Sequence, residues 1–468
     1  MLANQEQLIA AITREVLARL EQRLGGSAAG DDGVFPTVDE AVQAAAGSQP
    51  RVAAKSLEER GQMVGIIRRL CHDNADEWAR LELAETRIGR ADHKADKLRN
   101  IRLVQGAEAM ASEAQSDTSG LCVVEHAPWG VIGMVLPATH SVPTMASNAI
   151  NILASGNTAV FSPHPTGVKI AARALRQFNR EIERELGVRD VLTMAEEATI
   201  QNAEQMFRHP QVALLCVTGG PAVVNAAMKS GKRVIAAGPG NPPVVVDETA
   251  DFDRAAVSVI AGASFDNNLL CIGEKEVFVV ASVADRFVAA LRRAGAVQLD
   301  AQAIDKLTAA AFQFENGHAH VKRDYIGKDV AFLAQSAGVS APAGTDLLFG
   351  ETREDHPFVQ EEQMMPFLPV VRMPDVDAAI AASVRAEHGY RHTAVIHSRH
   401  IGNATKMARA MNCTLFIQNA PCFASLGVGG PSYSSHSIAT PTGEGVTTPM
   451  TFTRQRRIVI GGGALRIL

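Results

Sequence analysis

The chain has 468 residues, with 46% hydrophobic and 20% charged side chains. This is ordinary usage for a globular protein, and it excludes wholesale disorder. At roughly 150 residues per domain, the length predicts two or three domains. The formal net charge of −5 and the aromatic content of 5% exclude a strongly basic nucleic-acid binder and argue against base-stacking platforms.

Residues 2–24 form a short module of their own. Their apolar side chains recur at spacings of three and four, which predicts one amphipathic helix. Gly25 and Gly26 end the helix, and a linker follows to residue 33. The helix could pack on its own globular body or dock on a partner, and the residues alone leave both readings open.

From residue 38 onward, helical patterns alternate with buried strands. The first helices, at 38–45, 55–81 and 92–112, carry their charges on one face. Strands follow at 130–138, 157–163, 190–195, 212–217, 242–247, 276–280, 369–373, 393–398 and 414–418. Helices are predicted at 143–154, 168–186, 199–207, 222–230 and 252–263. Such alternation with continuously apolar strands predicts parallel, doubly wound sheets.

The longest stretch without Asp, Glu, Lys or Arg lies between Glu125 and Lys169. Several prolines interrupt it, so it cannot be one lipid-facing helix, and we expect no membrane span. No signal peptide is expected either, because Glu6 comes early and no apolar stretch of sufficient length follows.

The six cysteines contain no C-x-x-C pair and are too few for a disulfide framework, which fits a reducing cytosol. Cys271 lies between a predicted helix and the strand 276–280. At such a junction a thiol can have a lowered pKa and act as a nucleophile. Cys422, in a loop, is its one serious competitor. Of the other cysteines, Cys71 is expected in a helix, and three are expected in the core of strands: Cys122, Cys216 and Cys413.

A second candidate site is the turn Thr218-Gly219-Gly220, between a buried strand and a helix. Backbone N–H groups in such a turn can face a phosphate. The chain has no G-x-G-x-x-G fingerprint, however, and ordinary turn geometry is the simpler explanation of these residues alone.

Four histidines between His388 and His400 form a third candidate cluster. Their spacing lacks the neighbouring carboxylate of a pattern such as H-E-x-x-H. We therefore expect solvated or hydrogen-bonded histidines and no metal.

Eight segments carry a family resemblance. They are APWGVIGMVLPATH (127–140), SGNTAVFSPHP (155–165), VTGGPAVV (217–224), AAGPGNPPVVVDETAD (236–251), GASFDNNLLCIGEK (262–275), EEQMMPFLPVV (361–371), RHTAVIHS (391–398) and ATPTGEG (439–445). Together they resemble the aldehyde dehydrogenase superfamily, and most closely its CoA-acylating branch of bacterial microcompartments. The resemblance runs from about Val34 to the C-terminus.

The resemblance implies an α/β fold with a Rossmann-type cofactor domain, an α/β catalytic domain and a β oligomerisation arm. The implied boundaries are 34–109 and 129–238 for the cofactor domain, 239–430 for the catalytic domain, and 110–128 with 446–468 for the arm. A homo-oligomer, either a dimer or a dimer of dimers, is implied as well. Residues 2–24 resemble the branch's encapsulation peptide, joined by the linker 25–33, which implies docking on a shell protein.

The resemblance also implies roles for individual residues. Cys271 falls at the position of the family's nucleophile, and Glu362 at that of the carboxylate that holds the nicotinamide ribose. NAD and coenzyme A are the implied cofactor and co-substrate, with CoA entering through the cleft that NAD uses. The remaining implied cofactor-binding residues are Ser162, His164, Pro165, Thr218, Gly219 and Gly220.

Two departures from the hydrolytic members are informative. Thr139 stands where they carry an oxyanion-binding asparagine, and Ala236 stands where they carry a glutamate base. Without that base water is poorly activated, whereas thiols ionise near a pKa of about 8.5 and can attack a thioester unaided. This favours transfer to CoA. His140 also departs from the asparagine that is more usual in the branch.

The sequence thus predicts oxidation of a short aldehyde, propionaldehyde before acetaldehyde, by NAD+ and CoA through a Cys271 thioester. We expect the enzyme in the cytoplasm, inside a microcompartment. The alternatives are a hydrolytic aldehyde dehydrogenase that releases free acid and a non-catalytic nucleotide-binding scaffold. The preferred chain length and the choice between NAD and NADP stay open.

Overall fold

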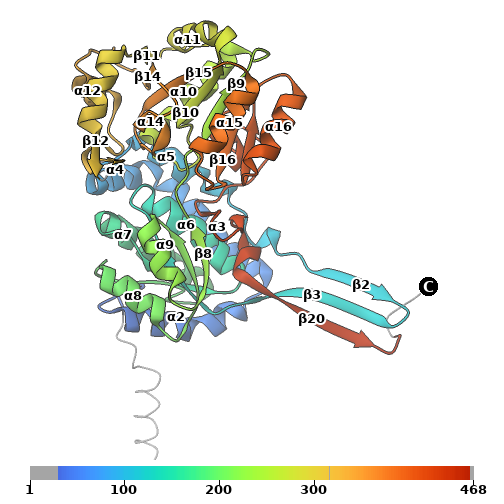
Figure 1. Cartoon of the computed structure of the whole chain (residues 1–468). Coiled ribbons are helices and arrows are strands. Elements are labelled where there is room, and N and C mark those ends of the chain that lie inside the picture. The colour runs from blue at the N-terminus through green and yellow to red at the C-terminus, as the bar shows by residue number, and fades with distance from the viewer. Residues whose placement is uncertain (1–29, 316, 464–468) are drawn as a thin grey trace, which may run out of the picture.

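The computed structural model describes residues 30–315 and 317–463. They form two lobes, each built on a parallel sheet, and a long antiparallel arm that projects from the body (Figure 1). The predicted N-terminal helix, 2–24, and most of its linker lie outside the described residues.

The first lobe contains a six-stranded sheet with the order β1-β6-β5-β4-β7-β8, and every pairing is parallel. Its strands are buried on both faces, as in other doubly wound sheets. They are β1 (Val34–Phe35), β4 (Val131–Val135), β5 (Thr158–Ser162), β6 (Leu192–Ala195), β7 (Val212–Thr218) and β8 (Arg233–Ala237).

Helices cover both faces of this sheet. Side chains of α3 to α7 form the core on one face, and side chains of α2, α8 and α9 form the core on the other. These helices are α2 (Val38–Ala53), α3 (Leu57–Asp73), α4 (Ala75–Thr86), α5 (Ala91–Arg99), α6 (Ser141–Ala154), α7 (Val168–Leu186), α8 (Ile200–Arg208) and α9 (Pro221–Met228).

The second lobe contains a seven-stranded sheet with the order β11-β14-β15-β10-β9-β16-β17, again parallel throughout. Its strands are β9 (Pro243–Val246), β10 (Glu276–Val280), β11 (Val297–Gln298), β14 (Leu348–Glu351), β15 (Phe367–Met373), β16 (Thr393–His397) and β17 (Leu415–Gln418). The covering helices are α10 (Phe252–Ser264), α11 (Ala284–Arg293), α12 (Ala301–Ala311), α13 (Val330–Ala337), α14 (Pro357–Gln360), α15 (Val376–Ala386) and α16 (Ile401–Met411).

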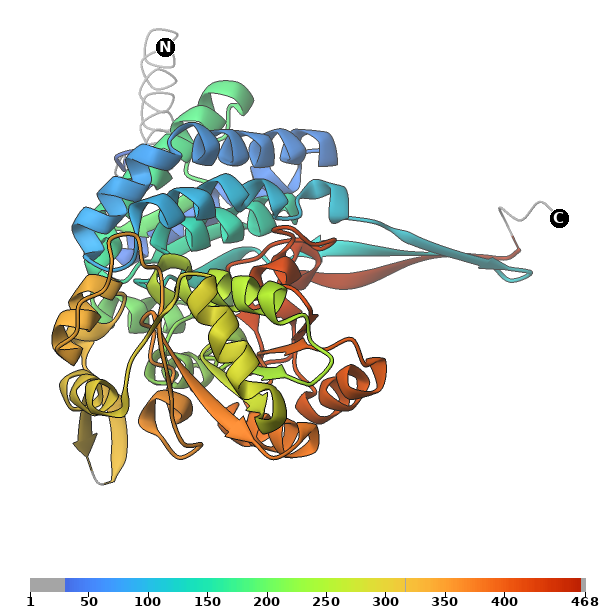
Figure 2. The same ribbon diagram turned by 90° about the horizontal axis from the view of Figure 1, so that it is seen from above.

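The arm joins two distant parts of the chain. Its central strand β3 (Gly120–Pro128) pairs antiparallel with β2 (Glu113–Asp117) on one side and with β20 (Thr453–Gly461) on the other. Figure 2 shows the arm extending well beyond both lobes. Two smaller pairings complete the described sheets: β12 (Phe312–Glu315) with β13 (His318–Val321), and β18 (Ile438–Ala439) with β19 (Gly445–Val446).

Most predicted elements are confirmed, with three corrections. The helix predicted at 38–45 continues to Ala53. The helix predicted at 92–112 ends at Arg99 and gives way to short 3₁₀ turns, Asn100–Leu103 and Ala107–Ala109. The helix predicted at 55–81 is two helices, because the chain bends at Asn74, which ends α3 and begins α4. Both breaks interrupt a continuous helical pattern, and the pattern of apolar residues alone does not reveal them.

Within the described ranges, no helix has both the length and the apolar character needed to cross a bilayer. The charge-free stretch after Glu125 forms the end of β3, then β4, α6 and β5. The predicted strand–helix–strand unit is therefore confirmed, and it lies in the core of the first lobe.

Candidate active site

Two adjoining cavities lie where the lobes meet, and the side chain of Cys271 lines both. One encloses about 710 Å³ of space outside protein atoms, open solvent included, and contains the predicted phosphate turn. The other encloses about 660 Å³ on the same basis and is lined mainly by apolar side chains of the second lobe and its C-terminal loops. Besides Cys271, both cavities are lined by His140, His436 and Ile438. Cys271 therefore belongs to the wall of both cavities.

The carboxyl edge of the six-stranded sheet forms one wall of the larger cavity. β7 ends at Thr218, and Gly219 and Gly220 follow before α9 begins. A Cβ atom on Gly220 would meet nothing within 4 Å, so the backbone is open to an approaching group. No described side chain caps α9, which leaves the N–H groups of its first turn available to a phosphate.

Glu362 lines the same cavity as this turn. Burial raises the pKa of its carboxyl, and nearby Lys275 offsets part of that shift. A carboxylate opposite a phosphate-binding turn can accept hydrogen bonds from ribose hydroxyls. The turn and Glu362 therefore fit a dinucleotide.

Ala236 is buried within β8, and its backbone N–H donates to Thr442 Oγ1 over 3.0 Å. Glu362 is the only carboxylate among the described residues that line the two cavities. The position at which the hydrolytic enzymes were expected to carry a glutamate base is thus filled by a methyl group.

The oxyanion candidate, Thr139, follows β4 in a loop at the same edge of the sheet and lines the cavity with Cys271. Its side-chain oxygen lies 3.4 Å from His140 Nε2. Its backbone carbonyl accepts weak hydrogen bonds from Lys94 Nζ at 3.3 Å and Lys97 Nζ at 3.5 Å. These hydrogen bonds from α5, a helix of the same lobe, therefore hold the Thr139 loop in place.

A short segment of left-handed backbone brings Cys271 to the cavities. Asp266, Asn267 and Asn268 have φ of 49°, 54° and 63°, a region that asparagine and aspartate tolerate better than most residues. Lys275 Nζ then donates to the carbonyl oxygens of Asn268 at 2.8 Å and Leu270 at 3.2 Å. These contacts set the loop that carries the thiol.

The environment of Cys271 does not lower the pKa of its thiol. Burial raises this pKa to about 12, and the negative charge of Glu362 adds to the shift, while Lys275 and Lys97 oppose it. The lowered pKa expected from the sequence is therefore wrong for the chain without bound cofactor. The thiol is protonated at neutral pH and must lose its proton as the reaction begins.

This shift has a measurable consequence for alkylation of Cys271. Because only the thiolate reacts, the rate of labelling by iodoacetamide should rise about tenfold per pH unit between pH 7 and pH 10. Mass spectrometry of the peptide that contains Cys271 measures that rate, and Cys422→Ala removes the competing thiol. A plateau below pH 9 would contradict the raised pKa.

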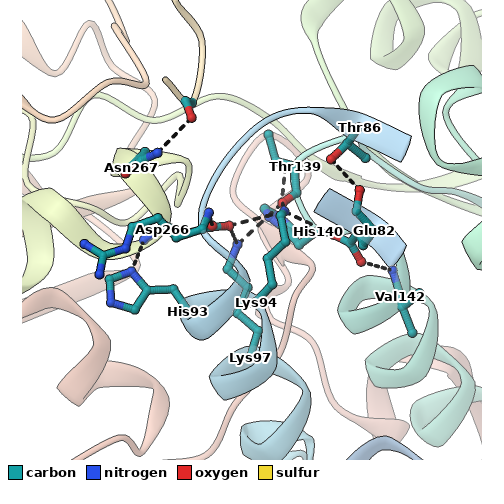
Figure 3. Close-up of polar contacts among 12 residues, drawn as sticks. Glu82, Thr86, His93, Lys94, Lys97, Thr139, His140, Val142, Asp266 and Asn267 are labelled. Atoms are coloured by element: carbon teal, nitrogen blue, oxygen red, sulfur yellow. Dashed lines mark hydrogen bonds and ion pairs between the residues drawn. The ribbon is translucent and has the colours of Figure 1, made fainter. Parts of the chain in front are cut away.

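Two buried lysines of α5 connect the lobes next to this site (Figure 3). Lys97 forms a short ion pair with Asp266, and Lys94 Nζ lies 3.5 Å from the same carboxylate and 3.3 Å from Glu82. All four charged side chains are at most 3% exposed. Burial tends to raise the pKa of Asp266, but the two lysines outweigh it and lower that pKa.

Three predicted cofactor-binding residues lie outside the lining of both cavities. Ser162 ends β5, and its carbonyl accepts the Leu136 N–H over 3.1 Å. His164 Nδ1 accepts the Thr166 N–H over 3.2 Å and so caps the turn that begins at Pro165. All three lie at the carboxyl edge of the sheet, beside the end of β4, and their role in cofactor binding stays a prediction.

The competing thiol, Cys422, is fully buried, and its backbone N–H donates to Glu274 Oε1 over 2.9 Å. It lines neither cavity that contains Cys271. The helical position predicted for Cys71 and the core position predicted for Cys216 are confirmed. Cys122 and Cys413 are half-buried instead, because Cys122 lies in the projecting arm and Cys413 just before β17.

No group of three or more His, Cys, Asp or Glu side chains within the described ranges could hold a metal ion. His388 and His392 are hydrogen-bonded, to the Gln360 carbonyl and the Thr393 hydroxyl, both at 2.8 Å. His397 is buried rather than solvated, with an unpartnered Nε2, because it belongs to a central strand.

Sequence reasoning missed two residues at the cavities, Lys97 and His436. Lys97 stands in a pattern typical of an exposed helix face. His436 is an isolated histidine in a serine-rich loop, YSSHS, and no spacing signal marks it.

The two lobes, the dinucleotide cavity and the thiol between them define an oxidoreductase of the aldehyde dehydrogenase fold. Residues 31–437 match the family described as the aldehyde dehydrogenase family. The chain belongs to this family, as the sequence predicted.

Three relatives are informative. The acetylating acetaldehyde dehydrogenase EutE of Salmonella typhimurium is 41% identical over 461 residues, covering 98% of each chain. A Rhodopseudomonas palustris propionaldehyde dehydrogenase with bound propionyl-CoA is 39% identical, with a TM-score of 0.90 over 93% of this chain and 97% of that one. A propionaldehyde dehydrogenase from the fucose utilisation microcompartment of Clostridium phytofermentans is 36% identical, with a TM-score of 0.91 over 93% and 100%.

Proposed function

We propose that this protein is a CoA-acylating aldehyde dehydrogenase that oxidises a short aldehyde, of about the size of propionaldehyde, with NAD+ and CoA. The observation that carries the proposal is the position of Cys271, which lines both the dinucleotide cavity and the second, mainly apolar cavity. The similarity to EutE and to the propionaldehyde dehydrogenases supports it.

In the first half-reaction, the Cys271 thiol releases its proton to solvent, the sulfur bonds to the aldehyde carbon, and the carbonyl π electrons move onto the oxygen. The backbone N–H of Cys271, together with Thr139, holds the negative oxygen of the adduct. NAD+, when bound, supplies the acceptor for the hydride that leaves this carbon. The acyl group then stays on Cys271 as a thioester, and Glu362 with the 218–220 turn is the set of residues that would hold the dinucleotide.

In the second half-reaction, the CoA thiolate attacks the thioester carbon and Cys271 leaves as a thiolate. Ala236 supports this outcome over hydrolysis, because no carboxylate at that position can take a proton from water. The acyl-enzyme implies ping-pong kinetics.

NADH formation should therefore depend on CoA. With propionaldehyde and NAD+ alone, we expect at most one NADH per active site, followed by continuous turnover once CoA is added. Absorbance at the NADH band after rapid mixing measures both phases. Sustained turnover without CoA would contradict the proposal and favour the hydrolytic alternative.

We further propose that the arm joins copies of this chain. β20 is an edge strand, and Ile458, Val459 and Ile460 are 44%, 70% and 40% exposed on it. Unpaired apolar edges of this kind invite pairing with a second chain.

Residues 2–24 are proposed as an encapsulation helix, supported by the microcompartment relative and by their amphipathic pattern. A fluorescent reporter fused to residues 1–24 should colocalise with shell protein in cells that form microcompartments. A control fusion with the apolar stripe replaced by serine should stay diffuse. A diffuse wild-type fusion would defeat the idea.

A further inference from the structure

Two histidines meet where the two cavities join. His140 comes from the loop after β4, and His436 comes from the loop that precedes β18. Their ring centroids are 5.7 Å apart, and both rings line both cavities with Cys271. Their imidazole rings therefore lie beside a substrate that is bonded to the Cys271 sulfur.

Neither ring has its hydrogen-bonding capacity filled by the described residues. His140 is 6% exposed, and its Nδ1 is buried without a partner. Only the backbone N–H of His436 is bonded, to Ser147 Oγ over 3.2 Å, and the described residues offer its imidazole no hydrogen-bond partner. Burying a polar atom without a partner is costly, so a ligand that supplies the missing partner gains affinity.

The rest of the smaller cavity is mostly apolar. Phe265, Ile272, Phe423 and Leu426 are among its lining residues, and they suit a carbon chain. Its other polar lining residues are Lys97, Asn100, Ser434 and Ser435. The two imidazoles differ from these because they also line the larger cavity, on the other side of Cys271.

The charge states of the two histidines and of Lys97 limit which chemical groups can bind beside the histidines. Burial lowers the pKa of His140 well below its usual value and that of His436 to about 3, and Lys97 adds to both shifts. Both rings are neutral at pH 7, so each has one N–H donor and one nitrogen acceptor. Lys97, which lines the same cavity, disfavours an ammonium group, and its ion pair with Asp266 removes the free cation that a carboxylate would need.

We propose that His140 and His436 bind a neutral hydroxyl on the second carbon of the aldehyde, so that short 2-hydroxyaldehydes are the substrate class of this site. This inference rests on the proposed function. The second carbon is chosen because the rings adjoin Cys271, whose sulfur bonds to the first.

The test compares glycolaldehyde with propanal, which differ by a hydroxyl in place of a methyl group. With NAD+ and CoA, and with rates referred to the unhydrated aldehyde, we expect kcat/KM of the wild type to favour glycolaldehyde by roughly tenfold or more. In His436→Phe and, separately, His140→Leu, that ratio should fall by roughly 10- to 100-fold. The change in the ratio between wild type and variant is independent of aldehyde hydration.

Two further variants separate hydrogen bonding from shape. His436→Gln keeps a donor and an acceptor and should retain most of the wild-type ratio. Phe423→Leu alters the wall of the same cavity without altering its hydrogen bonding, and should shift the ratio by less than about threefold. Because His140 and His436 belong to different loops, one variant that fails to fold leaves the other to decide.

The outcomes are distinguishable. A ratio that is the same in wild type, His436→Phe and His140→Leu overturns the inference, even if all rates fall together as they would for a general base. If the wild type forms NADH in a CoA-dependent reaction with propanal but not with glycolaldehyde, the inference is also overturned, while the proposed function stands. No CoA-dependent NADH with either aldehyde overturns both.

Discussion

Replacement of Cys271 by alanine should abolish NADH formation from aldehyde. The thiol is the only cysteine side chain among the described residues that lines the two cavities, and without it no thioester can form. Loss of a covalent nucleophile lowers turnover by about 10,000-fold or more. Steady-state NADH formation in the presence of NAD+, CoA and aldehyde measures the loss. Wild-type activity in this variant would show that another group is the nucleophile.

Cys422→Ala is the matched control. Cys422 is fully buried beside Glu274, and burial together with that carboxylate raises the pKa of its thiol well above the usual value. A buried, protonated thiol outside both cavities cannot attack an aldehyde, so this variant should keep most of its turnover. If Cys422→Ala lost as much turnover as the Cys271 variant, the loop that carries Cys422 would be required for activity, contrary to this expectation.

Local signals in the sequence account for much of the fold. The predicted helix 168–186 has the same bounds as α7, because its apolar spacing is regular and Gly187 ends it in a left-handed cap. The strand 276–280 coincides with β10, a short run of fully buried residues. By contrast β8, Arg233–Ala237, was not predicted, since its short sequence runs directly into the glycine-containing turn after it.

The site was predictable only in part, because its electrostatics depend on residues far apart in the sequence. The motif around Cys271 places the nucleophile, but burial raises the pKa of its thiol, and no local pattern reveals that burial. Lys94 and Lys97 lie in the polar helix ADHKADKLR, which predicts a solvated face. The structure buries both because Asp266, more than 160 residues away along the chain, supplies the opposite charge.

The second large effect is a loss of stability in Asp266→Asn, which removes the carboxylate of this buried cluster. The Asp266 carboxylate faces the ammonium groups of Lys94 and Lys97 and accepts the Arg90 backbone N–H over 2.6 Å. Asparagine adopts the left-handed backbone of this position as readily as aspartate, so the substitution removes charge without changing the fold of the loop. Lys94 would then keep its ion pair with Glu82, while Lys97 would have no ion pair among the described residues.

Leaving a buried charge uncompensated costs about 3–5 kcal/mol. We therefore expect Asp266→Asn to lower the melting temperature by roughly 3–5 °C, measured by calorimetry or circular dichroism. The control is Asp92→Asn. Asp92 is 59% exposed in its ion pair with Arg90, and loss of such a surface pair costs less than about 1 kcal/mol.

The pH dependence of the same pair of proteins separates charge from packing. Because the two lysines outweigh burial and lower the pKa of Asp266, its stabilising contribution is complete above the usual carboxyl pKa of about 4. It is lost as the pH falls through the lower value in the folded state. The melting temperatures of wild type and Asp266→Asn should therefore differ by a constant amount down to about pH 4 and converge below it. A difference that stays constant well below about pH 4 would contradict the electrostatic cause.

Removal of the partner charge should reverse part of the loss. In the double variant with Lys97→Met, one cation leaves together with the carboxylate, so the buried charge is again balanced by Lys94 and Glu82. A double-mutant cycle should then show strong coupling between positions 97 and 266. Because Lys97 also lines the cavity of Cys271, the cycle is measured by melting temperature and not by NADH formation, which a change in the cavity wall can alter separately.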